Sequence, residues 1–118
     1  MRTVKTDAAP YSQAKITGGL MFASGQIPVN PASGKIEAAD IEGQTEQVCK
    51  NIQALLEAAG SSMDKVVKTV CFLADIADFA AFNKVYEKFF TSCPARSCVA
   101  VKDIPKGALC EIECIAEV

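Results

Sequence analysis

An arginine and a glutamate are the residues of this chain whose sequence context best suits ligand binding or catalysis. Arg96 follows a proline in Pro-Ala-Arg-Ser-Cys at 94–98, just before an expected strand, so a stiff backbone carries the guanidinium. A planar guanidinium binds a small carboxylate with two hydrogen bonds. Glu111, in an alternating C-terminal segment, could orient a water or shuttle a proton. A surface salt bridge and a solvated strand glutamate would explain the same two residues, so spacing alone does not decide.

Four further residues suit the wall of a ligand cleft. Tyr11 could be a pocket wall with a hydroxyl, or simply a packed aromatic. Ser24 and Gly25 end an expected strand, where glycine permits close backbone approach, although a strand-ending turn looks the same. Asn83 lies off the aromatic stripe of an expected helix, where solvation would explain it. None of these residues identifies a function by itself.

The missing histidine and the six cysteines narrow the chemistry. Without histidine, Ser-His-Asp, Cys-His and histidine-dependent ribonuclease schemes are excluded within one chain. The cysteines could form disulfides, or four of them (Cys93, Cys98, Cys110 and Cys114) could bind zinc. If 110–114 is extended, however, its ends lie about 13 Å apart, too far for ligands of one ion. We therefore expect reduced thiols, most of them small core residues, and no metal.

Composition and charge exclude several classes of partner. The 118 residues, half of them hydrophobic, suffice for a single domain over 1–118 with its own core. The net charge is −2 and the basic residues are scattered, so we expect no nucleic-acid partner. No apolar run approaches the ~20 residues of a membrane span, and residues 1–13 lack an apolar signal segment. We expect a cytoplasmic protein without a membrane contact.

Two one-sided helices and six strands must position the candidate residues. The first helix follows Asp40, a suitable N-cap, and stops at Gly60, and the second spans about 78–90 with its aromatic residues on one face: Phe79, Phe82, Tyr86, Phe89 and Phe90. Strands are expected at 2–6, 14–17, 20–24, 66–73, 98–101 and 109–118, with a hairpin at Gly18-Gly19, a loop at 30–34 and a turn at 104–107. This order predicts an α+β fold, with two helices packed on one face of a mixed β-sheet.

The last strand predicts that the other sheet face meets another subunit. Alternation puts an apolar set under the helices, namely Cys110, Ile112, Cys114, Ala116 and Val118. The opposite set mixes two aliphatic residues with three carboxylates: Leu109, Glu111, Glu113, Ile115 and Glu117. Such a face suits neither a dry core nor free solvent, whereas a subunit interface with polar pockets explains it.

These segments together resemble the reactive intermediate deaminase (RidA) family over nearly the whole chain. The matching segments, in order, are PYSQA at 10–14, SGQIP at 24–28, DFA at 78–80 with Asn83, PARSCV at 94–99 and EIE at 111–113. The resemblance implies a chorismate-mutase-like fold. It also implies a homotrimer with a central β-barrel and three ligand clefts between subunits.

The resemblance also implies an activity and a role for each candidate residue. The activity is hydrolysis of reactive 2-imino and 2-enamino acids, such as 2-aminoacrylate and 2-iminobutanoate, to 2-keto acids and ammonia. Pyridoxal-phosphate-dependent serine and threonine dehydratases release these substrates, and the deaminase itself needs no cofactor. By motif, Arg96 grips the substrate carboxylate, the Cys98 backbone holds the imine end and Glu111 positions water. The cleft is lined by Tyr11, Ser24, Gly25 and Asn83.

Two rival functions remain open. A non-catalytic trimer could sense a keto acid in the same cleft, where Arg96 would bind the carboxylate equally well. A ribonuclease or translation inhibitor is a third reading, since some relatives carry that label. The acidic composition and the missing histidine count against it.

Overall fold

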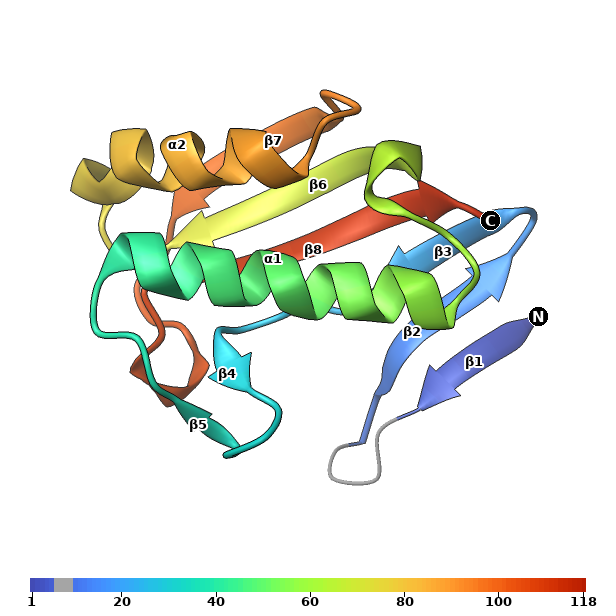
Figure 1. The fold of residues 1–118 in the computed structure, drawn as a ribbon, viewed down its shortest axis with the longest axis horizontal. Coiled ribbons are helices and arrows are strands. Elements are labelled where there is room, and N and C mark those ends of the chain that lie inside the picture. The colour runs from blue at the N-terminus through green and yellow to red at the C-terminus, as the bar shows by residue number, and fades with distance from the viewer. Residues whose placement is uncertain (6–9) are drawn as a thin grey trace.

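A six-stranded sheet organises the parts of the chain that this computed structural model describes, residues 1–5 and 10–118 (Figure 1). The strand order is β1-β2-β3-β8-β6-β7, and the neighbours pair antiparallel except β6 and β7. A parallel pair needs a long crossover, which helix α2 (Phe79–Phe89) provides. The strands are β1 Arg2–Lys5, β2 Ser12–Thr17, β3 Leu20–Ala23, β6 Val66–Leu73, β7 Ala95–Ala100 and β8 Cys110–Glu117.

Helix α1 (Ile41–Ala58) begins and ends where the sequence predicts. The Asp40 carboxylate accepts a hydrogen bond from the backbone N–H of Gly43 at 2.8 Å, which satisfies one free donor of the first turn. Gly60 follows the helix with φ 79°, a left-handed conformation that glycine adopts without strain. Both helices lie over the same face of the sheet (Figure 1). The predicted α+β arrangement is thus confirmed.

Helix α2 buries part of the aromatic stripe that the sequence predicts. Phe82, Tyr86 and Phe90 are buried, and the Tyr86 and Phe90 rings stack with centroids 4.3 Å apart. Phe79, which belongs to the same stripe, is 38% exposed. Phe79 is the first residue of the helix and lies at the edge of the core, where it remains open to other contacts.

Strand β8 divides the sheet into a covered face and an open face. Cys110, Ile112, Cys114 and Ala116 are buried on the helix side, as predicted, whereas Val118 lies beyond the strand and is exposed. On the other face Glu111 and Ile115 are half-buried, and Glu113 and Glu117 are exposed. The open face also carries exposed apolar side chains from neighbouring strands.

The largest error in the predicted strands concerns β7. The sequence places its start at Cys98, but β7 begins at Ala95 because parallel pairing with β6 begins there, opposite Lys68. Arg96 is therefore inside a strand and not before it. Smaller differences are the earlier start of β2 and a two-stranded hairpin, β4 Val29–Asn30 and β5 Lys35–Ile36, around the predicted loop. Thr6, the expected end of the first strand, lies outside the described residues.

Three 3-10 helices complete the described fold: η1 Met63–Lys65, η2 Ile76–Asp78 and η3 Pro105–Gly107. The last replaces the predicted turn at 104–107, and Gly18-Gly19 forms the predicted hairpin between β2 and β3. None of the helices in the described ranges is long and apolar enough to cross a bilayer.

Candidate functional site

Arg96 extends over the covered face of the sheet toward helix α2. Its backbone pairs with buried Thr69 of β6, so its side chain shares the helix side. One guanidinium nitrogen donates to the Asn83 side-chain oxygen at 2.7 Å. The guanidinium carbon lies 4.8 Å from the centroid of the Tyr86 ring and 5.5 Å from that of Phe79. Contacts from one helix therefore fix the guanidinium while leaving most of its donors for a ligand.

Tyr86 is itself held in place beneath Arg96. Its hydroxyl lies 2.7 Å from the Thr69 hydroxyl, and both groups are buried. Burial raises the pKa of Tyr86 to about 12, although the Thr69 hydrogen bond and the Arg96 charge oppose the rise. The phenol is thus neutral at physiological pH. It serves as a rigid aromatic surface for the guanidinium and not as a base.

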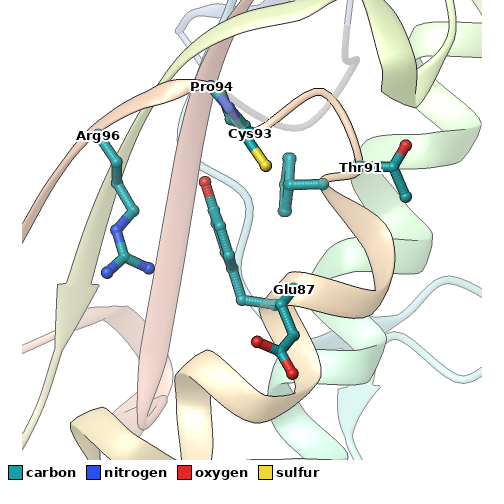
Figure 2. A pocket seen from close by; sticks show the side chains of 7 residues that line it. Glu87, Thr91, Cys93, Pro94 and Arg96 are labelled. Carbon is teal, nitrogen blue, oxygen red and sulfur yellow. The ribbon is translucent and has the colours of Figure 1, made fainter.

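A cavity of about 450 Å³ opens beside the stem of Arg96, between β7 and the C-terminal end of α2. Figure 2 shows the Cys93 sulfur directed into the space between Arg96 and that helix, with Glu87 on the helix side. The lining residues are Tyr86, Glu87, Phe90, Thr91, Cys93, Pro94 and Arg96.

Cys98 lies two residues after Arg96 on the same side of β7, in register with Cys71 of β6. Partial burial raises the pKa of the Cys98 thiol, and the nearby Arg96 charge only opposes the rise. A protonated thiol is a weak nucleophile. This environment disfavours a nucleophilic role for the Cys98 sulfur. None of the six cysteines forms a disulfide.

Glu111 lies on the opposite face of the sheet, beside Gly25. A Cβ added at Gly25 would overlap the Glu111 carboxylate, so the glycine permits the close approach. The Gln26 N–H donates to the Ile112 carbonyl at 2.8 Å and holds the Gly25 segment against β8. Burial, and then the charge of Glu113, raise the pKa of Glu111. A carboxylate with this shift is a better proton acceptor than an exposed one.

Ser24 and Tyr11 lie on the Gly25 side of the molecule. The Ser24 hydroxyl donates to the Ser12 carbonyl at 2.6 Å, and the hydroxyl oxygen can still accept a hydrogen bond. Tyr11 is 55% exposed. It lines a second cavity, of about 370 Å³, together with Gly25, Gln26, Asn51 and others.

The structure divides the seven predicted site residues into two groups. Arg96, Asn83 and Cys98 lie at the β7 edge on the helix side. The other group lies around the start of β8: Tyr11, Ser24, Gly25 and Glu111. Because Arg96 and Glu111 project from opposite faces of one sheet, a single chain does not bring them together.

Sequence reasoning missed three contributors around Arg96. Tyr86 and Phe79 were assigned to the core stripe, although both rings contact the guanidinium. Thr69 is not among the predicted site residues, yet it is a polar residue at a helix-facing position of β6. A hydroxyl within an otherwise apolar strand face was the signal that could have found it. Within the described ranges, no group of three or more potential ligand side chains is arranged to hold a metal.

Comparison with known proteins places this chain in one family. Residues 3–118 match the family described as Endoribonuclease L-PSP. The 2-iminobutanoate/2-iminopropanoate deaminase of Escherichia coli is 44% identical over 124 residues, covering 98% of this chain and 96% of the relative. The proposed regulator AldR of Lactococcus lactis is 57% identical over 110 residues, covering 92% and 87%.

Solved structures agree with the sequence comparisons. The crystal structure of E. coli TdcF with bound serine has a TM-score of 0.89 and 39% identity, and the match covers 98% of this chain and 94% of that one. A Yersinia pestis protein of the conserved Rid family has a TM-score of 0.92 and 47% identity, covering 98% and 94%. This chain belongs to the L-PSP family, also called the RutC or RidA family.

Proposed function

We propose that this protein hydrolyses 2-imino and 2-enamino acids to 2-keto acids and ammonia. The fixed guanidinium of Arg96 carries the proposal, because its free donors suit the substrate carboxylate. The 44% identical relative named as a 2-iminobutanoate/2-iminopropanoate deaminase supports it. The Cys98 backbone holds the imine end of the substrate beside that anchor.

The reaction uses one water and balances without a cofactor. Water attacks the iminium carbon, and the proton that it loses passes to Glu111. The tetrahedral adduct then carries a hydroxyl and an amino group. Glu111 returns the proton to the nitrogen, and ammonia leaves as the hydroxyl oxygen forms the carbonyl. The hydroxyl proton passes to the departing ammonia, so that the net products of the iminium and water are the keto acid and ammonium. Because an iminium carbon is already electrophilic, holding it in line with one water supplies much of the acceleration.

The positions of Arg96 and Glu111 require a second copy of the chain. The open sheet face combines carboxylates with exposed apolar residues, including Phe22 and Val99, which favours burial against another copy. We propose a homotrimer whose sheets enclose a central barrel. A head-to-tail interface closes into such a ring and repeats the same cleft three times. Each cleft then takes Arg96 from one subunit and Glu111 from its neighbour.

The substrates come from enzymes that dehydrate serine and threonine with pyridoxal phosphate, so we place the protein beside them in the cytoplasm. A keto-acid sensor is the second candidate, since a carboxylate anchor serves binding without turnover, and the proposed regulator AldR is similar to this chain. In that case the keto acid binds to the protein, and added imine decays no faster with the protein than without it.

The first test is turnover in a coupled threonine dehydratase reaction. Wild-type protein should speed the conversion of the imine to 2-oxobutanoate. Glu111→Gln should slow turnover by roughly 100-fold or more while sparing 2-oxobutanoate affinity, because the lost interaction is made mainly in the transition state. Wild-type kcat should also fall as the pH drops through the raised pKa of Glu111, since only the carboxylate accepts a proton. An unchanged rate for Glu111→Gln removes this carboxylate from the mechanism.

Mixing two inactive variants tests the shared cleft. Arg96→Ala and Glu111→Gln proteins, refolded together in equal amounts, should regain activity in roughly a quarter of the clefts, those that combine both intact residues. Each variant refolded alone is the control. A mixture as inactive as its components contradicts the shared cleft, and light scattering that reports a monomer contradicts the trimer.

A further inference from the structure

The open face of β8 carries a second carboxylate next to Glu111. Because side chains alternate along a strand, Glu111 and Glu113 project from the same side of the sheet, with their Cα atoms about 7 Å apart. Glu113 is exposed, and the proposed mechanism gives it no step. Two ionised carboxylates have no donor between them, so Glu113 acts on Glu111 through its charge.

The immediate neighbours of Glu111 strengthen the effect of such a charge. Phe72 of β6 lies directly across from Glu111, and Gly25 lies against its carboxylate. On β7, the next strand, Val99 is in register with Phe72 and faces the same side. These neighbours are uncharged, and Glu111 is half-buried among them. In surroundings of low polarity, a like charge raises the free energy of the ionised carboxylate more than it does in water.

The other described charges on this side of the sheet are farther from Glu111 or open to solvent. On β6, Lys68 lies four positions along the strands from Glu111. On β2, Lys15 donates to the Thr3 hydroxyl at 2.8 Å. The connection from β7 to β8 carries three charged residues that are all exposed, and solvent screens them: Lys102, Asp103 and Lys106. Burial, and then the charge of Glu113, are what raise the pKa of Glu111.

We propose that Glu113 is a positioning residue of the reaction, whose negative charge strengthens Glu111 as the acceptor of the proton from water. This inference rests on the proposed function, in which Glu111 transfers that proton. In the proposed trimer, Arg96 of the partner subunit favours the ionised form of Glu111 and so weakens it as a base. Glu113 offsets this cation. Proton transfer is most efficient when the pKa of the base lies near the working pH.

The first test is the pH dependence of imine hydrolysis by Glu113→Gln. Removing the charge makes Glu111 easier to ionise, so the acid limb of kcat should move to lower pH. At the pH where wild-type protein retains about a tenth of its maximal rate, the variant should retain roughly two to three times that share. Its maximal rate should be a few-fold lower, because a weaker base accepts a proton less readily. An acid limb that coincides with that of the wild type overturns the inference.

Glu117→Gln is the matched control. Glu117 is an exposed carboxylate on the same face of β8, but it lies about 20 Å from Glu111 along the strand, beyond the screening length of roughly 8–10 Å. Its pH profile should match that of the wild type. Glu113→Asp keeps the charge and should restore most of the wild-type profile. Equal shifts in Glu117→Gln and Glu113→Gln, or a Glu113→Asp protein that behaves like Glu113→Gln, would contradict the role of this charge.

A second measurement follows Glu111 without any substrate. Carbon-13 NMR of protein labelled at the glutamate carboxyls reports the ionisation of Glu111, and Glu111→Gln identifies its resonance. At the pH where half of the wild-type Glu111 is ionised, about three quarters should be ionised in Glu113→Gln. Glu113→Thr provides a second uncharged variant, because threonine suits a strand. An unchanged titration in both variants refutes the inference. A protein that hydrolyses no imine although Glu111 titrates as expected would instead refute the proposed function.

Discussion

The two faces of the sheet differ in how completely one chain builds them. On the helix side, the Arg96 guanidinium has an amide partner in Asn83 and aromatic contacts above a buried hydroxyl pair. On the open side, Glu111 lies against Gly25 among exposed apolar and acidic residues. Under the proposed function, the difference teaches that folding of one chain completes the carboxylate anchor, whereas the water-positioning half awaits the proposed assembly.

Arg96→Lys alters the helix side and should have the largest effect of the three substitutions compared. Lysine keeps the charge but loses the planar fork and the stacking on Tyr86. Losing a charged hydrogen bond costs about 1.5–3 kcal/mol. Turnover and 2-oxobutanoate affinity should therefore both fall, by roughly 10- to 100-fold. Calorimetry and the imine assay measure the two quantities, and normal values for both refute the anchor.

Gly25→Ala alters the open side of the sheet and should lower turnover less than Arg96→Lys does. The added methyl displaces the Glu111 carboxylate, and a misplaced catalytic group costs about tenfold in kcat, with keto-acid affinity retained. The double variant Gly25→Ala/Glu111→Gln separates positioning from general damage. It should be no slower than Glu111→Gln alone, because the alanine acts through a carboxylate that is already gone. Additive losses would show that Gly25 acts by another route.

Tyr86→Phe tests the helix side of the sheet again and should have the smallest effect on activity of the three substitutions. The ring remains beneath Arg96, but the buried Thr69 hydroxyl loses its hydroxyl partner and keeps only a weak contact from the Cys71 thiol at 3.9 Å. An unsatisfied buried hydroxyl costs about 1–3 kcal/mol of stability, and a looser ring should raise KM about threefold with kcat nearly unchanged. Thr69→Ser, which keeps the hydroxyl, should retain the wild-type KM. A lower melting temperature with an unaltered KM would assign the hydroxyl pair to stability alone.

The sequence predicts the helices and the two faces of β8 because both depend on local periodicity and caps. Asp40 and Gly60 bound α1 as expected, and alternation places Glu111 opposite the helices correctly. The sheet face from which Arg96 projects could not be predicted in this way. It depends on where β7 begins to pair with β6, which is a long-range contact, and a stretch of three residues was missing from the predicted strand. Without that register, the sequence did not show that Arg96 and Glu111 project from opposite faces of the sheet.

The contacts around Arg96 were beyond sequence reasoning for a related physical reason. Helical periodicity assigns aromatic residues to a stripe but does not say which of them reach the end of the core. Phe79 and Tyr86 therefore counted as equivalent core residues, although one is exposed and both lie against a cation. The motif resemblance identified Arg96 and Asn83 separately. The bond between them emerged only from the packing of α2 on β7.

The position of β7 has a consequence for the behaviour of the unassembled chain. Among the described strands β7 pairs only with β6, so its other side presents backbone donors and acceptors along a strand of six residues. Free edges of this kind template strand addition and aggregation unless charge, distortion or a covering surface protects them. Arg96 is the single charged residue of this strand, and Val99 is 46% exposed. If the proposed trimer covers this edge, conditions that dissociate it should promote precipitation along with inactivity, and solubility would depend on quaternary structure.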